Sequence, residues 1–202
     1  SRPIVLLGGG IKISRTQSKI RNFLNKLNIP VVTTWSGVDL IDHDNINYVG
    51  NIGVYGSRAA NFAVQNSDFL LTLGSRLDTR ITGGAPNTFA RDAKVISVDI
   101  DKNELSKKRG LNLHLKINSN LVEFFEFFDK ENFTYKNENW LIKCSNWKKK
   151  YPIVKKEYYL QKKYVNPYVF INELSKILNN KSIIIADDGG HLTWTIQAFK
   201  VK

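Results

Sequence analysis

The chain has 202 residues, of which 42% are hydrophobic, and it carries a formal net charge of +12. This length suits one sizeable domain with an additional element, and the apolar share is close to globular usage, so we expect a packed core rather than a disordered chain. The longest apolar runs are strand-sized, well short of the ~20 residues that cross a bilayer, which argues against a membrane protein.

The stretch up to about residue 130 predicts strands that alternate with helices. Its apolar runs are continuous, and each ends in glycine or a small polar residue. Such strands are typical of a parallel sheet that is covered on both faces and binds ligands at its carboxyl edge. We therefore predict an α/β fold with a doubly wound, mainly parallel sheet over residues 1–130. The expected strands are Pro3–Leu7, Val31–Thr33, Phe69–Leu73, Val95–Val98 and Leu113–Ile117, with helices over Ile20–Leu27, from near Ser57 and from near Asn120, and with a glycine-containing loop between Thr33 and Ser57.

Residues 131–165 are polar and rich in lysine, and we interpret them as a basic linker with a helix around Trp140–Lys150. Between Lys143 and Lys163 there are eight lysines and one glutamate, with tyrosines interleaved. Such a run could follow a phosphate backbone. It contains no arginine and no recognisable nucleic-acid-binding module, so a solvated surface is favoured and no nucleic-acid partner is expected. The single cysteine, Cys144, lies here without an activating neighbour, which favours an inert thiol in a reducing, cytoplasmic setting.

A second domain is expected to begin at residue 166. Pro167 suits the first position of a helix that runs to about Leu178. Ile183–Ala186 then has the composition of a strand, and Asp187–His191 that of the turn after it. A strand without partners cannot bury both faces, so the domain over residues 166–202 is expected to be incomplete and the parent polypeptide to extend in both directions.

Two glycine clusters suggest close approach of the backbone to a ligand. Gly8, Gly9 and Gly10 follow a buried strand, where bare backbone can approach a phosphate. They match neither the G-x-G-x-x-G fingerprint nor a P-loop, so a tight turn explains them equally well. In Gly50–Asn61, three glycines at a spacing of three precede a helix start, which would let the chain lie flat under an elongated ligand.

Charged residues follow the next two strands. In Gly74–Arg80 two arginines flank an aspartate, and paired guanidiniums near backbone amides suit a pyrophosphate. The alternative is that these three charged side chains only brace one another. Asp99 ends the following strand, where dinucleotide folds place a carboxylate on a ribose. Asp101 can cap a helix at the same place, and both roles can hold.

Taken together, these motifs resemble the central domain of acetolactate synthase and its thiamine-diphosphate relatives. Gly50–Asn61, Gly74–Arg80 and Val98–Glu104 stand in the family's order and spacing. Asp187–Trp194 is similar to the opening of the family's cofactor domain, which usually reads Asp-Val-Gly-Gln-His-Gln-Met-Trp. The resemblance covers nearly the whole chain. It implies a Rossmann-like central domain followed by the first βα unit of a thiamine-diphosphate domain.

The resemblance also implies cofactors and the residues that hold them. In acetolactate synthase the central domain cradles FAD without hydride chemistry in the main reaction, and the enzyme binds thiamine diphosphate and Mg²⁺. The family's activating glutamate and its metal-binding Gly-Asp-Gly stretch have no counterpart here, so no catalytic residue and no metal ligand is assigned. The implied FAD-type residues are Gly8, Gly9, Gly53, Gly56, Gly74, Arg76, Asp78, Arg80 and Asp99, the last near the adenosine end, and the implied thiamine-diphosphate-type residues are Gly189, Gly190 and His191.

Four residues depart from the family pattern. Gly190 replaces a glutamine and Asp188 a valine, while Tyr55 stands where acetolactate synthases commonly have histidine and Asn120 where they have aspartate. A relative that acts on another 2-oxo acid would show such departures.

The implied parent is a transferase of branched-chain amino-acid biosynthesis. It would decarboxylate a 2-oxo acid such as pyruvate and condense it with a second oxo compound, as a cytoplasmic homodimer or homotetramer, with or without a regulatory subunit. The 202 residues alone are expected to be inactive. Two alternatives remain: a thiamine-diphosphate decarboxylase or lyase without FAD, and a NAD- or nucleotide-binding module.

Overall fold

The structure is a computed structural model that describes residues 1–131, 135 and 137–202. Within these residues, six parallel strands form one sheet in the order β3-β2-β1-β4-β5-β6. The sheet confirms the predicted α/β fold. Its strands are β1 (Pro3–Leu7), β2 (Val31–Thr33), β3 (Tyr48–Asn51), β4 (Phe69–Leu73), β5 (Lys94–Asp99) and β6 (Leu115–Asn118).

The strand β3 corrects the expectation of a continuous loop between Thr33 and Ser57. It pairs with β2 across a register shift, because Val31 faces Tyr48 whereas Val32 faces Gly50. The extra residue on β3 bends the strand, and Gly50 adopts a φ of +141° there. Glycine in a strand often marks such a bulge. A four-residue strand with a central glycine therefore resembles a loop in sequence.

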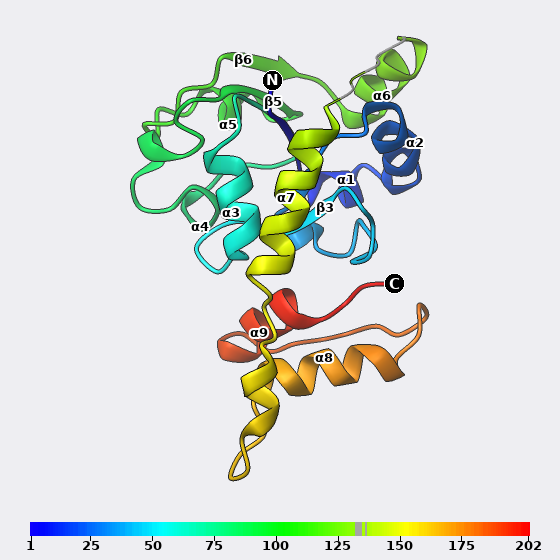
Figure 1. Cartoon of the computed structure of the whole chain (residues 1–202). Coiled ribbons are helices and arrows are strands. Elements are labelled where there is room, and N and C mark those ends of the chain that lie inside the picture. Colours follow the sequence, from blue (N-terminus) through cyan, green and yellow to red (C-terminus); the bar gives the residue numbers. More distant parts are fainter. Residues whose placement is uncertain (132–134, 136) are drawn as a thin grey trace.

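Two hydrophobic cores cover the two faces of the sheet, because successive side chains of a strand point to opposite sides. Val5 and Leu7 of β1 pack with helices α2 (Gln17–Leu27) and α6 (Leu121–Lys130). Residues Ile4 and Leu6 of the same strand pack on the other side. That side is covered by α3 (Arg58–Gln65) and α7 (Glu138–Lys150), and Figure 1 shows the four helices around the sheet.

The expected helix starts and stops are confirmed by their caps. The Ser57 hydroxyl accepts a hydrogen bond from the N–H of Ala60, and Asn28 ends α2 in the left-handed conformation. Asn120 caps α6 through the N–H of Val122. The shorter helices are α1 (Gly10–Ile13), α4 (Thr79–Thr82), α5 (Lys102–Ser106) and the 3₁₀ helices η1 (Trp35–Gly37), η2 (Pro86–Thr88) and η3 (Lys156–Leu160).

The helix expected in the basic linker is present as α7, and it packs onto the first domain. Trp140, Leu141 and Cys144 are buried in the core, and the Trp140 indole N–H donates to the Pro3 carbonyl at 3.0 Å. Burial raises the pKa of the Cys144 thiol to about 12, as expected for an inert cysteine. This packing makes α7 part of the central core, while the domain boundaries near residues 130 and 165 stay predictions.

The C-terminal segment holds two helices, α8 (Pro167–Ile177) and α9 (Gly190–Ala198), and Figure 1 places both beyond the end of α7. Pro167 takes the expected first position of α8. The predicted strand Ile183–Ala186 is wrong, because these residues form no ladder and Ile183 and Ile185 are 87% and 91% exposed. Within the described residues no strand lies beside them, and an isolated strand has no backbone partners.

None of the helices that the structure describes has the length and apolar character that crossing a membrane requires.

Candidate functional site

The carboxyl edge of the sheet has a switch point between β1 and β4. These two strands are neighbours in the middle of the sheet, and the connections that follow them lead to opposite sides, to β2 and to β5. Open parallel sheets bind ligands in the crevice at such a point. The loops after β1 and β4 meet there, where the N–H of Gly8 donates to the Leu73 carbonyl and that of Gly10 to the Gly74 carbonyl, both at 2.9 Å.

Three glycines interlock these two loops. A Cβ added at Gly8 would lie 2.2 Å from the Gly74 carbonyl oxygen, and one at Gly10 would lie 2.8 Å from the Gly74 Cα. Gly74 itself has a φ of +61°, which favours glycine. Close backbone contact therefore requires these glycines whether or not a ligand binds, and the tight-turn explanation accounts for them. The assignment of Gly8 and Gly74 to a flavin stays a prediction.

The glycine-rich segment before α3 is explained in a similar way. A Cβ at Gly53 would lie 2.4 Å from the Arg80 carbonyl, and one at Gly56 would lie 2.5 Å from the Ile52 carbonyl carbon. The N–H of Val54 also donates to the Arg80 carbonyl at 2.8 Å. The loop after β3 is thus clamped against the start of α4. Gly9 is in comparable contact, with its Cβ position 2.6 Å from the Ser36 hydroxyl.

The charged residues of Gly74–Arg80 do not brace one another. Asp78 caps α4, where its carboxylate accepts the N–H of Arg80 at 3.0 Å. Within the described part of the chain, no ion pair joins Asp78 to either arginine side chain. The Arg80 guanidinium lies 5.5 Å from the centre of the Trp35 ring instead, and the Arg76 Nε lies 3.4 Å from Glu104. The bracing alternative is therefore wrong.

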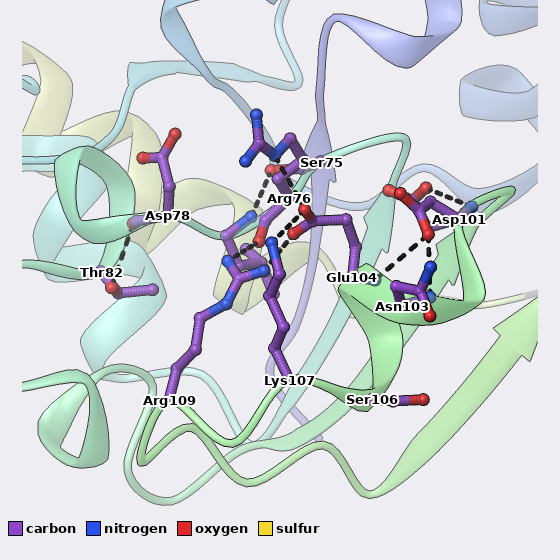
Figure 2. A network of polar contacts seen from close by, with 12 residues as sticks. Ser75, Arg76, Asp78, Thr82, Asp101, Asn103, Glu104, Ser106, Lys107 and Arg109 are labelled. Atoms are coloured by element: carbon purple, nitrogen blue, oxygen red, sulfur yellow. Dashed lines mark hydrogen bonds and ion pairs between the residues drawn. The ribbon is translucent and has the colours of Figure 1, made fainter.

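Glu104 is the centre of a network that sequence reasoning missed. Figure 2 shows Lys107 and Arg109 reaching its carboxylate from one side and Arg76 from the other. Hydrogen bonds from Lys107 and Arg109, with the charge of Arg76 added, lower the pKa of Glu104 to about 2. The sequence signal was a glutamate at the start of a short helix, followed by three basic residues from Lys107 to Arg109.

Asp99 and Asp101 form the turn between β5 and α5. Asp101 caps α5 by accepting the N–H of Asn103 at 2.8 Å, so its predicted cap role is confirmed. One oxygen of Asp99 accepts the N–H of Asp101 at 2.9 Å. Asp99 also lines a cavity of about 20 Å³, together with Ser97 and Glu104. That space holds about one water. The cavity beside Asp99 is therefore too small to hold a ribose.

Two buried donors near the same edge have no partner within the described residues: the Trp35 indole N–H and the Asn51 side-chain amide. Trp35 packs against the Tyr55 ring, with centroids 5.4 Å apart. Buried donors without acceptors cost free energy, so a ligand or water that offers acceptor atoms would be stabilised there. The sequence singled out neither donor.

A larger cavity of about 1460 Å³ separates this edge from the C-terminal segment, and both Trp35 and Asn51 line it. Leu192 and Thr195 of α9 line its other side, whereas Gly189 and His191 do not. Direct contacts also hold the two parts together. The Gln197 amide donates to the Tyr55 carbonyl, and the N–H of His43 donates to the Val201 carbonyl at 2.8 Å.

The turn before α9 has the geometry of an anion site. Gly189 has a φ of +104° with nothing near its Cβ position, and the helix begins at Gly190. Free N–H groups at a helix N-terminus attract phosphate. The His191 ring packs edge-on against the Trp194 ring, with ring centroids 5.9 Å apart. Asp188 adds a negative charge to the turn, where it accepts the N–H of Gly189, and this disfavours an anion unless a cation accompanies it.

Among the residues that the structure describes, no group of three or more histidine, cysteine, aspartate or glutamate side chains could hold a metal ion.

Comparison with known proteins identifies the family. The family described as "Thiamine pyrophosphate enzyme, central domain" matches residues 1–123. The acetolactate synthase large subunit of Cyanidium caldarium is 35% identical over 203 aligned residues, which cover 100% of this chain and 34% of that protein. A probable acetolactate synthase large subunit of Methanococcus aeolicus is 30% identical over 215 residues, covering 100% of this chain and 35% of that protein.

A third relative matches a shorter part of the chain at higher identity. The large subunit of acetolactate synthase isozyme 2 from Escherichia coli K12 is 38% identical over 115 residues, or 57% of this chain and 21% of that protein. The chain thus spans about a third or less of the length of these curated relatives. The matched range of the family, the switch-point edge and the similarity over the full chain agree, and the protein belongs to the thiamine pyrophosphate enzyme family, whose central domain it contains.

Proposed function

We propose that this chain is part of a thiamine-diphosphate-dependent enzyme of the acetolactate synthase type. The observation that carries the proposal is similarity along the full chain to acetolactate synthase large subunits from unrelated organisms. The whole enzyme would decarboxylate a 2-oxo acid such as pyruvate and condense it with a second oxo compound, which makes it a transferase. The reaction belongs to the whole enzyme, and the 202 residues alone are expected to be inactive.

Thiamine diphosphate supplies the carbanion chemistry of such enzymes when it is bound. In this chain the N–H groups of Gly190 and His191, at the start of α9, would hold its diphosphate end. The open space at Gly189 supports that role. Mg²⁺ would accompany the diphosphate and offset the charge of Asp188.

FAD is proposed at the carboxyl edge of the sheet. The free side of the Arg76 guanidinium and the carboxylate of Asp99 support it, as do the unpartnered donors of Trp35, after β2, and Asn51, at the end of β3. The glycines Gly8, Gly53 and Gly74 would then contribute through the loop shape that they permit rather than through direct contact. Asp78 and Arg80 would act likewise, through the cap of α4 and the packing on Trp35.

The flavin site is tested by titrating the purified chain with FAD and monitoring binding through the flavin fluorescence. Arg76→Ala should weaken binding about ten- to hundredfold, since a charge-assisted contact is worth ~1.5–3 kcal/mol. Arg91→Ala is the matched control, because it removes the same charge at the opposite edge of the sheet, just before β5. Equal affinity of wild type and Arg76→Ala would contradict the assignment of Arg76.

A second candidate is a decarboxylase or lyase of the same family without FAD. The observation that favours it is that Arg76 and Arg80 already have partners in Glu104 and Trp35. Absence of saturable FAD binding by the wild type would select this candidate. Assaying the whole enzyme with pyruvate, thiamine diphosphate and Mg²⁺ then separates the reactions, because condensation yields acetolactate and decarboxylation alone yields acetaldehyde.

The partners of the whole enzyme are further proposals. We expect a homodimer or homotetramer, with or without a regulatory subunit, acting in branched-chain amino-acid biosynthesis in the cytoplasm. A size measurement in solution tests the first point, and a monomeric whole enzyme would contradict it.

A further inference from the structure

The Glu104 carboxylate, near the carboxyl edge of the sheet, forms ion pairs with three basic side chains. The Arg76 Nε lies 3.4 Å from one oxygen of Glu104, Lys107 binds the same oxygen, and Arg109 binds the other (Figure 2). The Glu104 side chain is only 11% exposed, whereas that of Arg76 is 66% exposed. The acid is therefore enclosed while the arginine projects outward.

The fold fixes this carboxylate in place. Glu104 lies in α5, whose N-terminus is capped by Asp101 and whose Leu105 is buried. Helix α5 follows directly from β5, one of the inner strands of the sheet. The capped helix and its buried Leu105 therefore fix the position of Glu104. Arg76 thus contacts a carboxylate whose position is fixed.

Arg76 is held at two places, and one side of it is left free. The Arg109 guanidinium donates to the Arg76 backbone carbonyl at 2.7 Å, while the Arg76 Nε forms an ion pair with the Glu104 carboxylate at 3.4 Å. The terminal amino groups of Arg76 have no protein acceptor within the described residues. A guanidinium held in this way presents two parallel N–H donors, which match the oxygens of a phosphate.

The charges of the network also favour an anion. Glu104 and Asp99 offset two of the three cations that line the same small cavity, so the cluster keeps an excess of one positive charge. Positive charge of this kind attracts phosphate groups.

We propose that Glu104 is a positioning residue for the nucleotide phosphate at this edge: it orients Arg76 so that the two terminal amino groups of that arginine face the ligand. This inference rests on the proposed flavin site and adds to it a residue that does not touch the ligand.

Glu104→Gln distinguishes positioning from simple electrostatics, because the two predict opposite changes in the affinity for an anionic ligand. Removing a negative charge beside an anionic ligand should strengthen binding if only Coulomb attraction matters. Positioning predicts that FAD and ADP bind about two- to tenfold more weakly, since a released long side chain must be ordered on binding. Glu126→Gln is the matched control, because it removes the same charge from an exposed site on α6. Unchanged or tighter binding by Glu104→Gln would overturn the proposal.

A double-mutant cycle separates positioning from loss of fold stability. Arg76→Lys keeps the charge but removes the paired donors, so it should weaken binding of FAD and ADP by itself. In the Arg76→Lys background, Glu104→Gln should then have no further effect on affinity. Equal effects of Glu104→Gln in both backgrounds would mean that Glu104 acts on the fold alone, against the proposal. Thermal unfolding of each variant shows that the titrated protein is folded.

The Nε–H signal of Arg76 in nitrogen-15 NMR reports whether Glu104 restrains the Arg76 side chain, and the measurement needs no ligand. Its assignment comes from the signal lost in Arg76→Lys. We expect a restrained Nε–H in the wild type and a mobile one in Glu104→Gln. Equal mobility in the two proteins would show that Glu104 does not restrain Arg76. If neither FAD nor ADP binds the wild type, the proposed flavin site fails, and this signal alone decides whether Glu104 orients Arg76.

Discussion

Replacing Gly8 by alanine should destabilise the fold even though it adds a single methyl group. The added Cβ would lie 2.2 Å from the Gly74 carbonyl oxygen and 2.8 Å from the Ser75 Cα. Both neighbours are backbone, so no side chain can rotate away. Two hydrogen bonds, from Gly8 to Leu73 and from Gly10 to Gly74, hold the loops at this separation. The contact can be relieved only by moving the loops apart.

The expected cost is at the upper end of the range for overpacking, about 3 kcal/mol. For a chain of this size that corresponds to a fall in Tm of about 6–12 °C. Thermal and urea unfolding measure the loss directly. Gly84→Ala is the control, since nothing lies within 4 Å of its Cβ position and its φ is not in the left-handed region, so its stability should be unchanged or slightly higher.

This variant also separates two explanations of the glycine cluster. If Gly8 serves mainly to admit a ligand, Gly8→Ala should fold normally and lose only cofactor binding. If it serves loop packing, stability should fall without any ligand present. A Gly8→Ala protein within about 0.5 kcal/mol of wild-type stability, the usual scatter of neutral surface changes, would refute the packing explanation.

Three further predictions follow from other parts of the structure. Burial, and then the charge of Lys148, lower the pKa of His43 to about 4, so the unfolded chain binds a proton that the folded chain does not. The free energy of unfolding should therefore decrease as pH falls from 6.5 to about 4, and a urea series with His43→Gln, which should lack this component, checks it. In hydrogen exchange, the amide of Leu71 in the central strand β4 should be strongly protected and that of Ile184 should exchange rapidly, because only the former belongs to a ladder; equal protection of the two would contradict the unpaired state of residues 183–186. Trp140→Phe removes the hydrogen bond from α7 to β1 and should cost about 1 kcal/mol in urea unfolding, and an unchanged midpoint would show that the bond is not formed.

Local signals in the sequence predicted much of the fold. Apolar runs such as Pro3–Leu7 and Phe69–Leu73 became neighbouring parallel strands, because only a sheet covered on both faces buries such runs completely. Caps were also predictable, since Ser57 and Asp101 satisfy N–H groups within three residues of themselves. The positions of the candidate site followed from these, because loops after parallel strands meet at one edge.

Pairings between distant residues were decided only in the tertiary structure. The strand β3 exists because β2 supplies its backbone partners, and Ile183–Ala186 has the composition of a strand but lacks such partners among the described residues. The close contact of Gly8 with Gly74 joins loops that are far apart in sequence, so three glycines in a row could not reveal whether they serve a ligand or each other. Likewise, the Arg76 side chain pairs with Glu104 on α5 rather than with the nearby Asp78, because the Asp78 carboxylate caps α4. Sequence specifies the hydrogen-bonding and burial needs of each segment, and which distant group meets them depends on how the whole chain packs.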